Sequence, residues 1–333
     1  MRLVILIFMA VVLFLDISLK KFITISCTIV WIIYTIYYFV MLLNESDKKI
    51  STKEVISNIP NESLPELVRY FYKKKIDNRV FISIVFDMLM KNYISLVKDG
   101  DEYYFVNVEN QEVFLTKSEE AVKKILFREI GNSENVALSA IIKSSKKNSA
   151  YLYDEVQIFK STFENECAKE KYFKSNKNIF NNSLFYLVFS LILSFYNLFF
   201  VKSVYLFILI FSVTATISII VSNFKKIEDD RLSEYCEWLK FKNYIINKNL
   251  SSLNVETLEK YILYAYVLDC YNEFKTSVLL KYYEDKECFR DSLILRMVSS
   301  DIFDEIETKL NKSLNNIRIN TILLFKRNKG RRN

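Results

Sequence analysis

The chain has 333 residues, with 46 Lys and Arg against 39 Asp and Glu, which gives a formal net charge of +7. It contains only 3 glycines, so Gly-rich phosphate-binding loops have no material to be built from. Histidine is absent, which removes the commonest general base and most zinc-binding ligand sets. We therefore predict no catalytic, cofactor-binding or metal-ligating residues.

The 5 cysteines are Cys27, Cys167, Cys236, Cys270 and Cys288. Their number is odd and no C-x-x-C pair occurs, so reduced, packed thiols are expected, with a redox or metal role as the alternative.

An apolar run, 3–15, opens the chain and needs Asp16 to Leu19 to complete a span over 3–19, and an uncharged run, 22–43, follows Lys20 and Lys21. We interpret residues 1–43 as a transmembrane hairpin that is not cleaved, since no small-residue cleavage site follows the first run. The alternative is a signal sequence removed near residue 20, which would leave three spans.

The polar segment 44–181 begins with helical patterns. Ser63-Leu64-Pro65-Glu66 predicts a capping box, and Asn78 predicts the N-cap of a second helix. Ile94–Lys98 and Glu102–Val108 flank Asp99-Gly100, a strong hairpin signal. Two helices followed by a hairpin are typical of a winged helix-turn-helix.

A second copy is predicted to follow, which makes 44–181 a tandem winged-helix-like domain. Thr116-Lys-Ser-Glu119 predicts another capping box, and a short helix is expected over 136–142. The apolar faces of the helices in this second copy are predicted at Val122, Ile125, Leu126, Ile130, Leu152, Val156, Phe159, Phe163 and Cys167.

Nucleic-acid binding is not expected here. Residues 44–181 hold 22 Lys and Arg against 21 Asp and Glu, whereas DNA-binding domains concentrate positive charge on one face. Asp77 and Asp87 also interrupt the presumed reading helix. The basic residues that could build a small basic face are Lys73 to Lys75, Arg79, Lys91 and Lys143 to Lys147.

A second hairpin is predicted over 182–223, with spans 182–201 and 203–223 around Lys202. Basic residues near the span ends gather at 48–53, 160–177 and 225–242, which predicts that both termini and both polar segments are cytoplasmic. The clearly assigned spans, 22–43, 182–201 and 203–223, carry no ionisable acid or base, which argues against a transporter.

The segment 224–333 is predicted to be a cytoplasmic helical tail. Glu228-Asp229-Asp230 is interpreted as the acidic first turn of a helix, with a divalent-cation site as the alternative. Asn254 is a predicted N-cap, and the basic cluster 326–332 could bind anionic lipid or be a solvated end. The expected apolar stripes are Leu232, Tyr235, Trp238, Leu239 and Ile246, then Leu258, Tyr261, Ile262, Ala265 and Leu268, then Ile302, Phe303, Ile306 and Leu310.

Several short motifs resemble the YciQ-like predicted membrane proteins of bacteria, a family of unknown function. They are Leu64-Pro65-Glu66-Leu67, Ile76-Asp77-Asn78-Arg79, Phe86-Asp87, Lys91 to Leu96, Leu115 to Glu119, Glu237-Trp238 and Leu258 to Ala265. The resemblance covers roughly residues 40–270. It implies a large extracytoplasmic domain before the first span, which residues 1–43 do not supply, and it implies no catalytic residues.

The expected fold is thus an α-helical integral membrane protein with four spans, cytoplasmic α+β winged-helix-like domains and a helical C-terminal region. The expected function is a non-enzymatic scaffold or protein-interaction module on the cytoplasmic face of the cell membrane, with a protein partner or self-association through the polar lobes. The alternatives are a membrane-tethered winged-helix transcription regulator and an enzyme that uses the acidic groups at 228–230.

Overall fold

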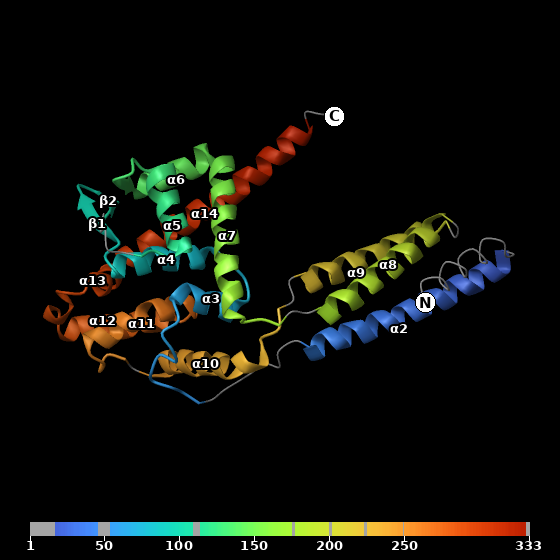
Figure 1. Cartoon of the computed structure of the whole chain (residues 1–333), viewed down its shortest axis with the longest axis horizontal. Coiled ribbons are helices and arrows are strands. Elements are labelled where there is room, and N and C mark those ends of the chain that lie inside the picture. The colour runs from blue at the N-terminus through green and yellow to red at the C-terminus, as the bar shows by residue number, and fades with distance from the viewer. Residues whose placement is uncertain are drawn as a thin grey trace. The chain divides into compact units, whose positions relative to one another are not determined.

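The computed structural model describes residues 17–45, 54–108, 114–174, 177–199, 202–222, 225–248 and 250–330 (Figure 1). The chain divides into two compact units. Unit 1 comprises residues 1–50 and 173–228, and unit 2 comprises residues 51–172 and 229–333. Unit 2 is therefore assembled from two stretches of sequence that are separated by part of unit 1.

Three apolar helices form the described part of unit 1: α2 (Ile17–Glu45), α8 (Lys177–Phe199) and α9 (Val204–Ser222). Helices α8 and α9 pack side by side as a hairpin, and α2 packs along α8 (Figure 1). The two ends of this hairpin are joined, since Phe173 and Ile227 form an antiparallel bridge and the Lys174 N–H donates to the Lys226 carbonyl at 2.9 Å. The chain segments just before α8 and just after α9 are thus held together by backbone hydrogen bonds.

Polar side chains of unit 1 face its interior. The Trp31 Nε1–H donates to Ser190 Oγ at 2.8 Å, and the Thr35 and Tyr186 hydroxyls lie 3.0 Å apart. Asn197 is buried and donates to the Leu193 carbonyl. The exposed positions on these helices are instead largely apolar, and they include Ile25, Ile29, Ile32, Ile33, Ile36, Phe39, Leu184, Val188, Phe195, Ile208, Leu209, Phe211 and Ile219.

The prediction of four membrane spans is wrong for the part of the chain that the structure describes. No helix there is both long enough and apolar enough to cross a membrane. The prediction counted only the absence of charged residues. Helix α9 has 19 residues, which at 1.5 Å per residue is about 28 Å, and the first turns of α8 carry Lys177, Asn181 and Asn182.

The predicted break between the first two runs is also wrong. Lys20 and Lys21 lie inside α2, which continues to Glu45. No glycine or proline stands near these lysines, so nothing in the local sequence ends a helix there. The first predicted span, 3–19, lies almost wholly outside the described residues.

Unit 2 begins with the predicted helix–helix–hairpin order. Helices α3 (Pro65–Lys73) and α4 (Asn78–Met90) precede strands β1 (Ile94–Asp99) and β2 (Glu102–Asn107). The hairpin is confirmed: the strands pair antiparallel with Asp99 opposite Glu102. Gly100 adopts φ of +58° in the turn, the left-handed conformation that glycine accepts without strain.

The predicted second winged-helix copy is replaced by an extension of the first. Helix α5 (Lys117–Lys123) and the π-helical η1 (Lys124–Ile130) lead to strand β3 (Asn135–Ala137), followed by α6 (Leu138–Lys147) and α7 (Ser149–Glu170). Strand β3 pairs with β2, which gives one antiparallel sheet of order β1-β2-β3. The sequence did not predict β3, because a three-residue strand leaves no measurable alternation.

The second stretch of unit 2 is helical throughout its described residues. It comprises η2 (Asp229–Arg231), α10 (Leu232–Asn247), α11 (Val255–Val267), α12 (Tyr271–Glu284), η3 (Glu287–Phe289), α13 (Leu293–Ser299) and α14 (Ile302–Gly330). The apolar face predicted for α11 is confirmed, since all five of its residues are buried. On α10 the prediction is partly wrong: Trp238, Phe241 and Ile245 are buried, whereas Leu232 and Ile246 are exposed.

Helix α4 is the core of unit 2. Ten consecutive residues, from Val80 to Leu89, are buried. Helices α3, α5, α11, α13 and α14 and strand β1 all pack against it. The rings of Phe86 and Phe303 stack with centroids 3.9 Å apart, which links α4 to α14. The chain segments on both sides of the α8–α9 hairpin thus share one hydrophobic core.

The predicted helix caps have mixed outcomes. Thr116 forms a capping box with Glu119, and Asn254 accepts from the Thr257 N–H, so both are confirmed. The Ser63 box is wrong, because Leu64 is the N-cap of α3 and makes no side-chain bond. The second cap is displaced by one residue: Asp77, not Asn78, accepts from the Arg79 N–H.

We predict that Gly131→Ala destabilises the fold by about 1–3 kcal/mol, because an added Cβ overpacks a tight backbone contact. That Cβ would stand 2.4 Å from the Asn135 carbonyl oxygen at the start of β3. Thermal and denaturant unfolding of the full-length protein measure the effect. Gly100→Asn is the control, since nothing lies within 4 Å of its Cβ position and asparagine tolerates a positive φ. Equal losses in both variants would contradict the prediction.

Candidate functional site

Helix α5 positions two sets of charged residues on opposite faces. Its start is fixed by the capping box, in which the Thr116 N–H donates to Glu119 Oε2 at 2.7 Å and the Glu119 N–H donates to Thr116 Oγ1 at 3.1 Å. Ser118, Glu119 and Val122 then face the core. The other face carries Lys117, Glu120, Lys123 and Lys124 toward a surface groove.

A buried ionic cluster lies on the core side of α5. It consists of Glu66 on α3, Asp87 on α4, Lys91 directly after α4, and Glu119 on α5. Lys91 Nζ forms ion pairs with Asp87 and, at 3.1 Å, with Glu119 Oε1. The side chains of Asp87 and Glu119 are only 10% and 2% exposed, so Lys91 supplies the charge that lets two carboxylates remain inside the protein.

The third carboxyl of this cluster is not paired. Glu66 is 2% exposed, and its Oε2 has no hydrogen-bond partner among the described residues. Burial, followed by the negative charge of Asp87, raises the pKa of Glu66 to about 8. Glu66 is therefore largely protonated in the folded protein at neutral pH.

The pKa values of three neighbouring groups are raised as well. Burial raises the pKa of Asp87 in spite of its ion pair with Lys91. Burial alone would lower the pKa of Lys91, but the hydrogen bond and charge of Asp87 and the charge of Glu119 outweigh it, so that pKa is raised. Burial, then Asp87 and Glu66, raise the pKa of Tyr264 on α11 to about 12.

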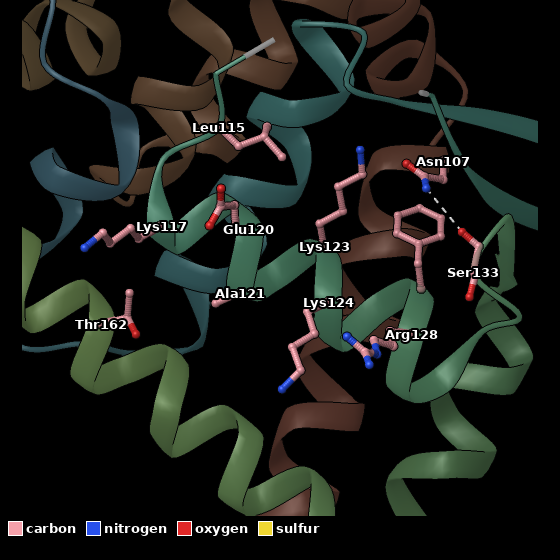
Figure 2. Close-up of a pocket in the computed structure, with 11 residues that line it drawn as sticks. Asn107, Leu115, Lys117, Glu120, Ala121, Lys123, Lys124, Arg128, Ser133 and Thr162 are labelled. Atoms are coloured by element: carbon pink, nitrogen blue, oxygen red, sulfur yellow. Dashed lines mark hydrogen bonds between the residues drawn. The ribbon is translucent and has the colours of Figure 1, made fainter. Parts of the chain in front are cut away.

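The groove on the other face of α5 has a volume of about 730 Å³. Figure 2 shows Lys124 and Arg128 side by side, with Thr162 on the neighbouring helix α7. Asn107 closes the far end by donating to the Ser133 carbonyl at 3.2 Å (Figure 2). The lining carries four cationic side chains, Lys117, Lys123, Lys124 and Arg128, against the single carboxylate of Glu120.

The charges of this groove are only partly used within the protein. Lys124 pairs with Glu155 at 2.7 Å and Glu129 at 3.7 Å, and Lys123 Nζ donates to the Val108 carbonyl at 3.5 Å. The π-helical segment η1 lines the groove, and π-helical turns are frequent at functional sites. The groove is therefore an exposed cationic surface with an apolar floor at Phe127, suited to an acidic segment of another molecule.

The basic residues considered for nucleic-acid contact do not gather into one free face. Lys73 and Arg79 pair with Asp269, and Lys91 belongs to the buried cluster. Helix α4, the presumed reading helix, is enclosed by other helices along Val80 to Leu89. A helix buried on all sides cannot enter a DNA groove.

The acidic run at 228–230 and the described cysteines lie outside both the buried cluster and the α5–η1 groove. Asp229 and Asp230 lie in the short helix η2. Within the described ranges, no three acidic or cysteine side chains are arranged to hold a metal ion. Among the described cysteines, Cys167 and Cys270 are buried and Cys27 and Cys236 are half-buried, and none of them is in a disulfide.

One comparison with known proteins gives a match. Residues 56–276 match the family model described as predicted membrane protein (DUF2207) C-terminal domain. The chain belongs to this family. No curated protein and no solved structure matches the chain.

This family match supports the coarser part of the resemblance seen in the sequence, namely a family of predicted membrane proteins whose function is unknown. The link to YciQ-like proteins stays a prediction. The matched region contains the whole buried cluster, helices α8 and α9, and the groove.

Sequence reasoning named the members of the buried cluster without seeing that they meet. Glu66 was assigned to a cap, Asp87 to the surface of a reading helix, and Lys91 to a basic face. One signal was present: each interrupts an otherwise apolar helix pattern or stands directly after one, where an unpaired charge would be costly.

We predict that wild-type stability falls as the pH rises from 4.5 to about 8, because folded Glu66 keeps a proton that the unfolded chain releases. One such proton contributes at most about 1.4 kcal/mol per pH unit. Glu66→Gln removes this contribution, and denaturant unfolding across that pH range measures it. Asp87 adds a slope of its own in both proteins. Glu120→Gln, on the exposed face of α5, is the control, and an unchanged slope in the Glu66 variant would refute the assignment.

Proposed function

We propose that this protein is a non-enzymatic interaction module held at the cell membrane. Unit 1 contacts lipid, and unit 2 presents the α5–η1 groove to an acidic segment of a partner protein. The membership in a family described as predicted membrane proteins supports the membrane part. Four membrane spans are not included, since no described helix is long and apolar enough to cross a bilayer.

The exposed apolar faces of unit 1 carry this proposal, in addition to an apolar interior that includes Trp31, Tyr186 and Ile210. Ser190, Ser194 and Asn197 are fully buried, whereas Ile29, Ile33 and other large apolar side chains are 44–62% exposed along α2. Water-soluble proteins rarely expose apolar patches larger than a few hundred Å², and such patches mark membrane or partner contacts. Polar groups bonded inside and apolar groups outside suit hydrocarbon surroundings.

Basic residues support a cytoplasmic orientation. Lys174, Lys225 and Lys226 lie just outside the ends of the α8–α9 hairpin. The cytoplasmic leaflet is anionic and attracts basic segments next to apolar ones. We therefore place unit 2 and both chain termini on the cytoplasmic side.

The groove supports the interaction part. It combines an apolar floor with an excess of positive charge, and its walls come from α5, η1 and α7, which are ordered by the buried cluster behind them. The transcription-regulator alternative loses its main support because α4 is enclosed.

We predict that Ile33→Lys lowers binding of the full-length protein to phosphatidylcholine vesicles at least about tenfold, since a lysine in hydrocarbon costs more than 2 kcal/mol. Vesicle flotation after detergent removal measures the bound fraction. Ile158→Lys on α7 of unit 2 is the matched control, because Ile158 is 53% exposed and Ile33 is 62% exposed. Equal binding of both variants would rule out lipid contact through this face of α2.

We predict that a photo-reactive amino acid at Leu115, in the groove, gives a discrete crosslinked product in cells. The same probe at Tyr283, which is 75% exposed on α12, is the control and gives no such product. Charge reversal by Lys117→Glu with Arg128→Glu abolishes the Leu115 product, because the partner segment is acidic. Identical products from both positions, or insensitivity to the charge reversal, would contradict a role of the groove.

A further inference from the structure

A second cavity of unit 2 lies where the α3–α4 connection meets α7 and α14. Its volume is about 600 Å³, within the range of small-molecule sites. Three separate chain segments line it, and neither the lipid-contacting face of unit 1 nor the α5–η1 groove contributes to it. Its charged and amide lining residues are Arg69, Lys75, Asp77, Asn78, Arg79, Gln157, Lys160, Glu307, Asn311, Asn315 and Arg318.

Some of these charges neutralise one another. The Arg69 Nε–H donates to both oxygens of Asp77, at 3.2 and 3.1 Å, and its Nη2 forms a further ion pair with Oδ2. Arg69 and Arg79 also share Asp269, at 2.7 and 2.6 Å. These groups form a rigid wall with no charge to offer a ligand.

The remaining charges are unbalanced. Lys75, Lys160 and Arg318 face the cavity against one carboxylate, Glu307, which accepts a hydrogen bond from the Tyr266 hydroxyl at 3.3 Å. Three cations with one anion leave an excess of positive charge along the cavity, where Lys160 is half-buried and Lys75 and Arg318 are exposed.

Lys160 and Arg318 line the same cavity, from α7 and α14 respectively. Lys160 is half-buried on α7, and its pKa is lowered by burial first and by the positive charge of Arg318 on α14 second, with Glu164 offsetting this only in part. Two cations held close together cost stability, and an anion between them would relieve that repulsion.

Amide groups complete the wall opposite α7. Asn78 Nδ2 donates to Asn311 Oδ1 at 2.7 Å and to Asn315 Oδ1 at 3.1 Å, so α4 and α14 are fixed relative to each other along the cavity. Both N–H groups of the Asn78 amide are used in this way, so the amides fix the wall and the cations are the groups left to bind an anion.

We propose that this cavity binds a phosphate-bearing small molecule, with its phosphate group between Lys160 and Arg318. The excess of cations and the cavity size together fit a compact dianion with several acceptor oxygens. The phosphate could belong to a free metabolite or to a lipid headgroup.

The test is the thermal unfolding of the full-length protein in detergent, with inorganic phosphate compared with chloride at equal ionic strength. Phosphate is expected to raise the melting temperature of the wild type. Lys160→Met and Arg318→Gln each weaken the apparent phosphate affinity at least about tenfold. Without phosphate, Lys160→Met is as stable as the wild type or more so. Lys98→Met, an exposed lysine on β1, is the control and keeps the full phosphate response.

Adenosine monophosphate and a soluble inositol phosphate then distinguish the two sources. A stronger response to the nucleotide indicates a free metabolite, and a stronger response to the inositol phosphate indicates a lipid headgroup; both support the site if Lys160→Met abolishes them. No phosphate response in the wild type, or a response that survives in both cavity variants, would overturn the proposal. Arg318 is exposed, so Arg318→Gln keeps the test decisive even if Lys160→Met fails to fold.

Discussion

The structure of unit 2 depends on how Lys91 compensates buried negative charge. Asp87 and Glu119 come from different helices, and each would be expensive to bury alone. By pairing with both, Lys91 fixes the end of α4 against the start of α5. The opposite face of α5 is the cationic wall of the groove, so the orientation of that wall is set from inside. Glu66 in this cluster already holds a proton. Because the short helix α5 carries both Glu119 and residues that line the groove, a change in the protonation state of the cluster would be transmitted to the groove by that helix.

A second ionic contact joins the two stretches of unit 2. Arg69 on α3 binds Asp77 and reaches across to Asp269 and to the Val267 carbonyl at the end of α11. Asp269 has φ of +60° and receives Lys73 and Arg79 as well. The chain that leaves for unit 1 after Tyr172 and returns at Asp229 is thus locked to its own beginning. The same contact neutralises Asp77 at the cavity between the α3–α4 connection, α7 and α14. The remaining charged residues of that cavity are mainly cationic.

Local patterns in the sequence were enough for the hairpin at Asp99-Gly100, the Thr116 box, the Asn254 cap and the buried faces of α7 and α11, because each depends on neighbouring residues only. The Ser63 box failed because the Ser63 N–H, which a capping box pairs with the Glu66 carboxylate, donates to Asn61 Oδ1 instead, and the helix starts one residue later. Strand β3 and the cavity could not be predicted, since both exist only through pairing between distant segments. Lys160 and Arg318 each look like ordinary surface cations until α7 and α14 bring them together.

The two units differ in what they leave outside. A buried polar group is costly unless it is bonded or neutral, and large exposed apolar faces mark contacts with membranes or partners. Unit 2 buries aromatic and aliphatic side chains around α4, and Lys91 compensates the carboxylates buried beside them. Unit 1 also has an apolar interior, around Trp31, Tyr186 and Leu193, and it holds the hydrogen bonds of Ser190 and Asn197. Its outer face carries the isoleucines of α2, and this contrast in exposed surface favours lipid as the surrounding of unit 1.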